Sequence, residues 1–439
     1  MKKIFAIILC KILHFMGKLT GRGSSLPGKA ALGICRDILG RIELPDRIIA
    51  VTGSNGKTST VEMIAAVLKG RGIKVVWNQE GANQIEGIVT LALSHASLGG
   101  RVKGDVFLIE VDERYAAKIF KYLCPTQLVV TNLCRDQLTR NRHPEKVYEN
   151  ILSAVRPQTE LMLNADDPLS SCLARGRGKV KWFGVEKCSV SADHPTGAYH
   201  DGAYCPVCKG PMEYDYVNYN HIGSYRCPRC GHARPRPDYL GASVDLENGY
   251  LTTGSGVRIR LSLRSIYHGY NALTAWAVCC NAGIPGEAAA SILSCHRLKN
   301  GRVQPFTLGS HRGMLLTSKH ENSIAYDTNL HYIASSERDC VVLIIVDAVS
   351  RKYFTCETSW LWDIDFDQLN QLHVKKIILS GRYCKDLAEC FSFTDLHNWS
   401  VQPDICRAVA GIGTRGSEDV YAVTCFSDRD KLLAQVERQ

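Results

Sequence analysis

The 439 residues, 45% of them hydrophobic and 22% charged, predict two to four globular domains at roughly 100–200 residues each. The net charge is +10, but no run of lysines and arginines is long enough for a nucleic-acid-binding arm, so the basic surface indicates anionic ligands instead. The 19 cysteines are scattered through a long chain, which excludes a disulfide framework and indicates a reducing cytoplasm.

Residues 1–19 begin like a signal peptide, yet the first apolar run (Ile4–Cys10) ends at Lys11 with no cleavage site of small residues close behind it. A membrane span would need about 20 apolar residues. The apolar residues continue at helical spacing and predict an amphipathic helix that either packs on the protein, which we favour, or rests on a membrane surface. We expect a cytoplasmic protein, at most peripheral to the inner face of the membrane. Residues 21–28, rich in Gly, Ser and Pro, predict a loop.

The next segment has the pattern of a phosphate-binding loop. An apolar run at 47–51 predicts a strand, the apolar spacing of 61–69 predicts a helix, and the turn between them reads GSNGKT. Such a turn directs backbone N–H groups and a helix N-terminus at an anion. Lys57 would reach the β- and γ-phosphates and the Thr58 hydroxyl would bind Mg²⁺. Val51 replaces the first glycine of the usual pattern.

Strand-like runs recur at 74–77, 105–110, 127–131 and 160–164, and helical stretches separate most of them. This alternation predicts a parallel α/β sheet with functional residues at the carboxyl ends of its strands, where Glu110, Asn132 and Asn164 fall. Glu110 is the predicted Mg²⁺ partner, directly or through water. Asp112 and Glu113 are either further carboxylates of this site or a solvated strand end.

Residues 190–240 interrupt the alternation and contain a metal-binding pattern. Two C-x₂-C pairs, Cys205 with Cys208 and Cys227 with Cys230, are separated by eighteen residues. Each pair lies in a Pro/Gly turn, and four thiolates suit a closed, structural Zn²⁺ site. We therefore predict an inserted zinc ribbon.

A helix is predicted at 267–279, and a second α/β segment follows residue 301, with strands at 340–346 and 376–379. The predicted organisation is an N-terminal helical segment (1–45), a central ATP-binding domain (46–300) with the ribbon at about 195–240, and a C-terminal Rossmann-like α/β domain (301–439). Arg135 and Asp136 follow the 127–131 strand and could lie near the phosphates or the acceptor.

Three of these segments, Gly53–Thr58, Leu163–Pro168 and Tyr270–Asn271, resemble the central domain of Mur ligases, the ATP-dependent ligases of peptidoglycan synthesis. Further segments resemble the MurT branch, the ligase subunit of lipid II isoglutaminyl synthase. They are Gly21–Gly23 with Leu26–Gly28, Asn78–Asn83, Glu110–Glu113, Asn132–Gln137, the four-cysteine ribbon, Gly301–Arg302 and Ser359–Phe366. The resemblance covers nearly the whole chain.

The resemblance implies phosphorylation of the α-carboxyl of D-glutamate in the lipid II stem peptide, and attack of ammonia on the acyl phosphate to give D-isoglutamine. A separate glutaminase subunit of the GatD type would supply the ammonia within a heterodimer, and no nucleic acid would be involved. The implied nucleotide-binding residues are Gly53, Ser54, Asn55, Gly56, Lys57, Thr58, Ser59 and, for the adenine, Asn271. Thr58 and Glu110 would hold Mg²⁺, and the four ribbon cysteines would hold Zn²⁺.

In the family, an aspartate two residues before a Ser-Trp pair completes the Cys-His dyad of the partner. Glu357 occupies that position, and its extra methylene changes the reach of the carboxylate by about 1.5 Å. Asp347 and Asp363 are alternatives. Other departures are Thr139 in place of an aspartate, residues 319–323, and a longer loop at 346–356. The ATP-binding half therefore matches the family closely and the C-terminal half loosely.

Three other functions fit parts of the sequence. A Mur-type ligase that adds an amino acid would need no glutaminase, but the ribbon argues against it. A nucleotide-binding scaffold with a degraded active site fits the loose C-terminal half, although Lys57, Thr58 and Glu110 are intact. A zinc-ribbon nucleic-acid binder would use the arginines at 226, 229, 234 and 236 with nearby tyrosines.

Overall fold

The computed structural model describes residues 1–19, 25–79, 81–137, 141–196, 201–298, 303–348 and 357–438. These residues form two compact units. The larger contains residues 1–134, 143–195 and 201–298, and the smaller contains 135–142, 196–200 and 299–439.

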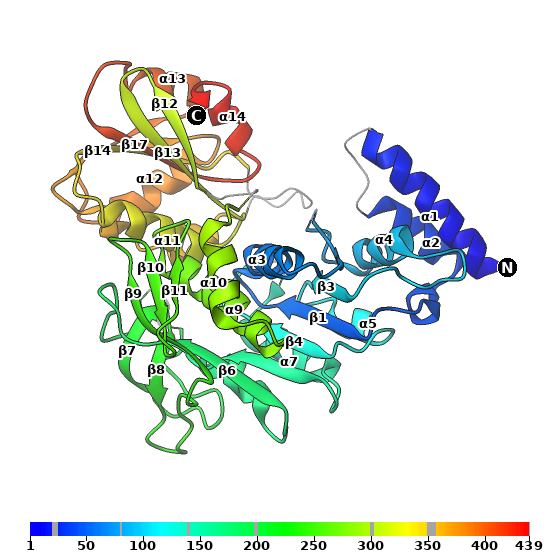
Figure 1. Cartoon of the computed structure of the whole chain (residues 1–439). Helices are drawn as coiled ribbons and strands as arrows, with labels where there is room; N and C mark the ends of the chain where they lie inside the picture. Colours follow the sequence, from blue (N-terminus) through cyan, green and yellow to red (C-terminus); the bar gives the residue numbers. More distant parts are fainter. Residues whose placement is uncertain are drawn as a thin grey trace. The chain divides into compact units, whose positions relative to one another are not determined.

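A sheet of nine strands, counted within the described residues, forms the centre of the larger unit (Figure 1). Its order is β11-β10-β9-β6-β5-β4-β1-β3-β2; the strands from β2 to β9 pair in parallel, and β10 and β11 extend the sheet antiparallel. The strands are β1 (Arg47–Thr52), β2 (Val75–Trp77), β3 (Val106–Glu110), β4 (Gln127–Val130), β5 (Glu160–Asn164), β6 (Val180–Val185), β9 (Tyr239–Asp245), β10 (Tyr250–Thr253) and β11 (Arg258–Arg260).

Helices cover both faces of this sheet, so β3 and β4 are buried along their whole length. On one face α3 (Lys57–Gly70), α9 (Ile266–Asn281) and α10 (Gly286–Cys295) pack together. The other face shares a core with α1 (Lys2–Leu19), α2 (Leu26–Ile34), α4 (Ile85–His95), α5 (Ala116–Phe120) and α7 (Pro144–Ala154). Short helical turns occur at η1 (Ile38–Arg41), α8 (Pro168–Ser171) and η2 (Cys172–Ala174).

The predicted α/β fold with a parallel sheet is confirmed, and each predicted strand of the larger unit appears within one or two residues of its expected ends. Residues 190–240 contribute a separate two-stranded hairpin of β7 (Glu213–Tyr219) and β8 (Ile222–Arg226), and β9 begins at their end, at Tyr239.

The loop predicted at 21–28 is wrong in its last part, because α2 begins at Leu26. Pro27 stands in the first turn of this helix, where its missing N–H costs nothing. A Cβ on Gly28 would lie 1.9 Å from the Glu86 carbonyl oxygen, so this glycine permits α2 and α4 to pack closely. Residues 21–24 lie outside the described residues.

The N-terminal segment is the predicted amphipathic helix, and it packs on α2 and α4 through Ala6, Ile7 and Cys10. Among the residues described, no helix combines the length and the apolar character that crossing a bilayer requires.

The smaller unit has its own seven-stranded sheet within the described residues, in the order β16-β15-β14-β17-β13-β12-β18. The strands from β16 to β13 are parallel, whereas β12 is antiparallel to both neighbours. They are β12 (Val303–Leu308), β13 (His311–Ser318), β14 (Cys340–Ile345), β15 (Val374–Ser380), β16 (Trp399–Gln402), β17 (Asp419–Cys425) and β18 (Glu437–Arg438).

Two separate apolar clusters cover the two faces of this second sheet. One contains α11 (Ser323–Ala334), α12 (Cys384–Ser392), η3 (Ser359–Asp363) and η4 (Phe366–Leu369). The other contains α13 (Ile405–Ala410) and α14 (Arg429–Leu433). The predicted strands at 340–346 and 376–379 are confirmed as β14 and β15.

Candidate active site

The turn between β1 and α3 has the tight conformation that its glycines permit. Gly53 and Gly56 have φ angles of 126° and 85°, a region that other residues rarely adopt. A Cβ on Gly53 would lie 2.3 Å from Thr131 Oγ1, and one on Gly56 would lie 2.1 Å from Asn271 Oδ1. The turn is therefore packed directly against the end of β4 and against α9, and the structure brings Asn271 to the phosphate-loop sequence.

Hydrogen bonds from the end of β4 fix the shape of this turn. The Ser54 backbone N–H donates to the Asn132 carbonyl oxygen at 2.8 Å, and the Asn55 N–H donates to Asn132 Oδ1 at 3.0 Å. Thr131 Oγ1 donates to the Asn55 carbonyl oxygen at 2.6 Å. Asn132, predicted only as a polar residue at a strand end, thus holds the loop in place.

Lys57 and Thr58, in the first turn of α3, meet carboxylates at the end of β3 and in the residues that follow it. Lys57 is 3% exposed, and its Nζ lies 3.1 Å from Glu113 Oε1 and donates to the carbonyl oxygens of Gly53 and Ser54. Thr58 Oγ1 donates to Glu110 Oε2 at 2.8 Å. Ser59 follows in the same turn.

Asp112 and Glu113 are both 3% exposed, so the alternative of a solvated strand end is wrong. The sequence left both alternatives open because alternation along a strand stops at its end. The chain turns inward after β3, and the Asp112 N–H donates to the Asn83 carbonyl oxygen at 2.9 Å. Asn83, which the sequence did not single out as a site residue, also donates to Glu110 Oε1 at 2.9 Å.

The geometry of Thr58 and Glu110 fits a magnesium ion. Adjacent ligands of an octahedral Mg²⁺ with bonds of 2.0–2.1 Å are about 2.9 Å apart. The observed hydroxyl–carboxylate separation is 2.8 Å. Both are hard oxygen ligands, and Lys57 lies in the same helical turn, so this cluster has the groups needed to bind a metal-complexed polyphosphate.

A buried polar network joins the residues after β5 to the start of α9. Tyr270 Oη donates to Asp166 Oδ2 at 2.6 Å, and Arg234 Nε lies 2.6 Å from Asp166 Oδ1. Asn218 Nδ2, from β7, donates to Tyr270 Oη at 2.8 Å. Burial raises the pKa of Asp166, and the nearby Arg234 charge opposes this rise. This network fixes Tyr270 beside Asn271, a role the sequence did not indicate for Asn218 or Arg234.

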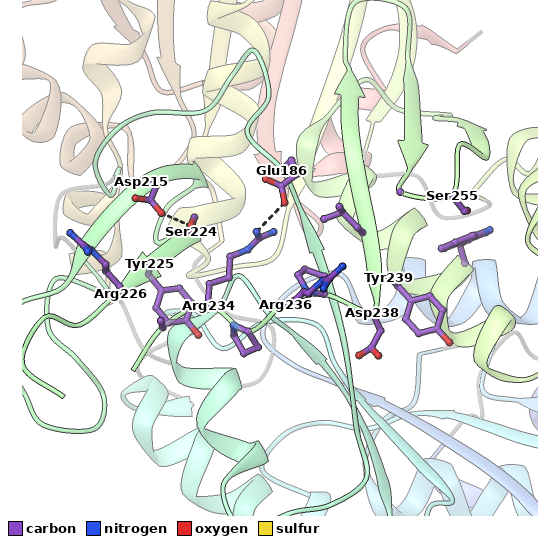
Figure 2. Close-up of a pocket in the computed structure, with 16 residues that line it drawn as sticks. Glu186, Asp215, Ser224, Tyr225, Arg226, Arg234, Arg236, Asp238, Tyr239 and Ser255 are labelled. Carbon is purple, nitrogen blue, oxygen red and sulfur yellow. Dashed lines mark hydrogen bonds and ion pairs between the residues drawn. The ribbon is translucent and has the colours of Figure 1, made fainter. Parts of the chain in front are cut away.

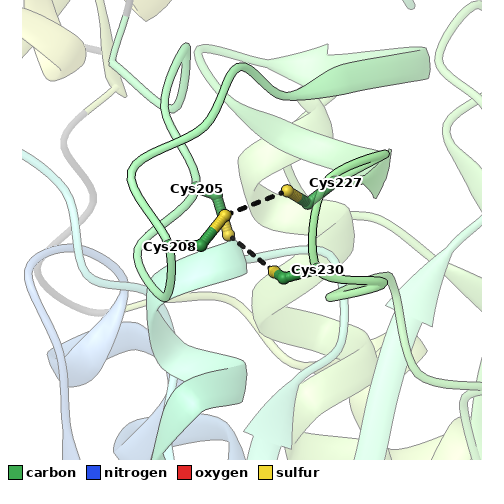
Figure 3. A group of neighbouring side chains, drawn as sticks. All are labelled: Cys205, Cys208, Cys227 and Cys230. Atoms are coloured by element: carbon green, nitrogen blue, oxygen red, sulfur yellow. Dashed lines mark hydrogen bonds between the residues drawn. The ribbon is translucent and has the colours of Figure 1, made fainter.

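The four ribbon cysteines come together as predicted (Figure 3). Their sulfur atoms all lie within 4.8 Å of one another, with Cys205 to Cys230 at 3.6 Å and Cys208 to Cys227 at 3.5 Å. A tetrahedral zinc with Zn–S bonds near 2.3 Å requires sulfurs about 3.8 Å apart, and a disulfide requires about 2 Å. The cluster therefore fits a zinc ion.

The turns of the ribbon present N–H groups to the sulfurs, as in a zinc knuckle. The Gly210 N–H donates to Cys208 Sγ at 3.4 Å. Burial opposes ionisation of Cys227, but backbone hydrogen bonds and its thiol neighbour lower its pKa to about 7. A thiol that ionises near neutral pH is a ready zinc ligand.

A pocket of about 700 Å³ lies beside the ribbon hairpin and β9 (Figure 2). Arg226, Arg234 and Arg236 line it together with Tyr225 and Tyr239. Arg234 is neutralised by Asp166 and Glu186, and Arg226 pairs with Glu213. Paired arginines offer little to a nucleic-acid backbone, so this surface gives no support to the nucleic-acid alternative.

In the smaller unit, Glu357 lies two residues before the start of η3. Its Oε1 accepts a hydrogen bond from the Ser359 N–H at 2.8 Å, and bonding to Ser359 lowers its pKa. Asp363 is 8% exposed, and Asp347 pairs with Lys431. Residues 349–356, most of the predicted longer loop, lie outside the described residues, as do Thr139, Gly301 and Arg302.

Arg135 and Asp136 belong to the smaller unit, despite their position in the sequence. Asp136 accepts a hydrogen bond from Asn322 Nδ2 at 2.6 Å and lies 3.7 Å from Lys319 Nζ. The divergent segment 319–323 therefore has Asp136 as its partner, a contact across 186 residues that no local pattern indicates.

In the same unit, Asp327 of α11 lies close to two other aspartates, Asp363 and Asp365. Its Oδ1 accepts a hydrogen bond from the Asp365 N–H at 2.9 Å. Burial, reinforced by the charges of Asp365 and Asp363, raises the pKa of Asp327 to about 7. Asp327 therefore titrates near neutral pH.

Family models match two parts of the chain: the Mur ligase middle domain at residues 51–203 and the MurT ligase C-terminal domain at 320–428. The lipid II isoglutaminyl synthase (glutamine-hydrolyzing) subunit MurT of Streptococcus pneumoniae is 30% identical over 389 residues, covering 87% of this chain and 84% of the relative. The subunit MurT of Staphylococcus aureus is 28% identical over 390 residues, covering 88% of this chain and 87% of the relative.

Solved structures agree on the fold. A pseudomurein peptide ligase type C from Methanothermus fervidus superposes with a TM-score of 0.70 at 18% identity, covering 90% of this chain and 79% of the other. MurF ligase from Thermotoga maritima, solved in complex with ADP, superposes with a TM-score of 0.59 at 14% identity, covering 93% of this chain and 83% of the other. The chain therefore belongs to the MurT family and is a Mur-type ligase.

Proposed function

We propose that this ligase acts in peptidoglycan synthesis and amidates the α-carboxyl of D-glutamate in the lipid II stem peptide, at the expense of ATP. The observation that supports this proposal most directly is the cluster of Lys57, Thr58, Glu110 and Glu113 at the phosphate-loop sequence. The relatives' name, lipid II isoglutaminyl synthase, supplies the substrate and the reaction.

The chemistry follows from the weakness of a carboxylate as an electrophile. A carboxylate oxygen attacks the γ-phosphorus, ADP leaves, and the resulting acyl phosphate is attacked by ammonia, which loses a proton as phosphate departs. Lys57 would leave Glu113 for the phosphates and offset the developing charge, and the N–H groups of residues 54–59 would orient the triphosphate. Mg²⁺ between Thr58 and Glu110 would supply charge neutralisation, and Asn271 would contact the adenine.

The ribbon cysteines would hold a structural Zn²⁺. Four protein ligands close the coordination sphere, so the ion would have no open position for chemistry. The ribbon arms carry Asn218 and Arg234 into the network around Tyr270. Zinc would therefore support the nucleotide site indirectly, by ordering these arms.

Ammonia would come from a glutaminase partner of the GatD type, as the words "glutamine-hydrolyzing" and "subunit" in the relatives' names suggest. Glu357 is the proposed residue that completes the partner's Cys-His dyad. Its hydrogen bond from the Ser359 N–H fixes one carboxylate oxygen and favours the ionised form, which is the form that could orient a histidine.

The test is ADP release by the purified chain with lipid II, Mg·ATP and ammonium chloride, because free ammonia replaces the partner. The product should carry an amide in place of the D-glutamate α-carboxyl, seen by mass, and the Lys57→Ala variant should give none. ADP release only with an added amino acid would favour the amino-acid-adding alternative. ATP binding without turnover would favour the scaffold.

A further inference from the structure

Helix α1 has two faces of opposite environment. One face is buried against α2 and α4 (Figure 1), whereas the large apolar residues of the other are exposed. The exposed fractions run from 39% at Ile8 to 107% at Met1. The exposed set is Met1, Ile4, Phe5, Ile8, Ile12, Phe15, Met16 and Leu19.

These residues form a single continuous stripe. At about 100° per residue, the seven side chains from Ile4 to Leu19 fall within an arc of about 120°, and Met1 immediately precedes the helix. Lys2 lies about 40° beyond one edge of the arc, and Lys18 lies about 40° beyond the other. Lys11 is on the same side as Lys18, but its Nζ donates to the Ser94 carbonyl oxygen of α4 at 2.9 Å. An apolar stripe bordered on both sides by lysines is the pattern of a helix lying in a lipid–water interface.

The N-terminal segment that contains this helix carries formal charges of one sign only. Residues 1–36 contain seven lysines and arginines and no aspartate or glutamate, so they account for seven of the net ten positive charges of the chain. A protein partner would need a groove of matching shape. An anionic lipid surface needs only phosphate head groups for the lysines and a hydrocarbon boundary for the stripe.

We propose that α1 lies in the surface of a bilayer containing anionic phospholipid, with this stripe immersed and the exposed Lys2 and Lys18 at the head groups. The buried face keeps its contacts with α2 and α4, so docking requires no rearrangement of the larger unit. The proposal does not depend on which reaction the ligase catalyses. A membrane-held ligase would meet a lipid-anchored substrate on the surface where that substrate resides.

The test is flotation of the full chain with vesicles of phosphatidylglycerol and phosphatidylcholine, and with phosphatidylcholine alone. We expect binding to the anionic vesicles that weakens with salt. The double variant Phe5→Asp/Phe15→Asp should bind at least about tenfold more weakly, since each change removes a large apolar side chain from the interface and adds a negative charge. The control Leu98→Asp/Leu372→Asp alters two exposed leucines elsewhere, 55% and 97% exposed, and should bind like the parent.

Thermal unfolding and zinc content should be unchanged in both double variants, because all four side chains are exposed. Turnover of a lipid-free stem peptide should also be unchanged, which separates this proposal from the proposed function. Absence of binding to anionic vesicles, or equal binding by the Phe5/Phe15 variant, would overturn it. So would a dimer of the parent chain that this variant abolishes, because a second copy would then cover the stripe.

Discussion

Replacing Arg234 by methionine should destabilise the larger unit strongly. The Arg234 side chain is 13% exposed and its partner Asp166 is fully buried, so the substitution leaves a buried carboxylate without its guanidinium. Breaking such a pair typically costs 3–5 kcal/mol. Asp166 keeps hydrogen bonds from Tyr270 Oη at 2.6 Å and from the Val185 N–H at 2.7 Å, so we expect about 3 kcal/mol.

The assay is thermal unfolding, followed together with zinc retention. For a unit of this size, about 3 kcal/mol corresponds to a fall of roughly 6–12 °C in the unfolding midpoint. The matched control is Arg226→Met, which breaks a pair between side chains 68% and 51% exposed and should cost less than about 1 kcal/mol. Equal shifts in the two variants would refute the argument from burial.

The loss should also depend on pH. Burial already raises the pKa of Asp166, and removing Arg234 raises it further. Between the unfolded pKa and this raised folded pKa, the folded protein holds a proton that the unfolded chain has released, so stability falls as pH rises through that window. Arg234→Met should therefore be more destabilising at alkaline than at mildly acidic pH, and a pH-independent loss would contradict the role of Asp166.

Four further results are expected. Lys57→Ala should lower ATP-dependent turnover by at least about a hundredfold and leave zinc content unchanged. Cys205→Ser should lower zinc stoichiometry and stability before it affects chemistry, measured by metal analysis and thermal unfolding. The parent should lose stability as pH rises toward 7, because the pKa of Asp327 is raised to about 7 in the folded protein. The free energy of unfolding of Asp327→Asn, relative to that of the parent, should therefore increase by about 2–3 kcal/mol between about pH 5 and pH 8. Glu357→Ala should abolish glutamine-dependent turnover of the complex with the proposed glutaminase partner and spare ammonium-dependent turnover.

Each expectation has an outcome that contradicts it. Turnover retained by Lys57→Ala would remove the phosphate-loop assignment, and a fully folded, zinc-free Cys205→Ser variant would remove the structural metal. Parallel pH profiles for the parent and Asp327→Asn would show that Asp327 ionises normally. Equal loss of both activities in Glu357→Ala would make Glu357 a structural residue that supports the start of η3.

Elements with strong local patterns were predictable from the sequence. The strand, turn and helix around Lys57 and the strand ends at Glu110 and Asn132 follow from apolar periodicity and glycine placement. The clustering of the four ribbon cysteines follows from their spacing alone, because two C-x₂-C turns are typical of a shared metal site.

The parts that were not predictable depend on distant partners. The burial of Glu113 requires Lys57 from another strand–helix connection, and Asp136 requires Asn322, 186 residues away. Leu26 begins a helix where composition indicated a loop, because close packing on α4 needs Gly28 within α2. Composition cannot separate a glycine that turns the chain from one that admits a neighbouring helix.

The central claim is that the carboxylate is activated by phosphoryl transfer. Its most direct test uses stem peptide in which both oxygens of the D-glutamate α-carboxyl are ¹⁸O, with Mg·ATP and ammonium chloride, followed by mass analysis of the released phosphate. The account predicts one ¹⁸O in each phosphate and retention of the other in the amide, because the attacking carboxylate oxygen departs with phosphorus. Unlabelled phosphate accompanying amide formation would contradict it.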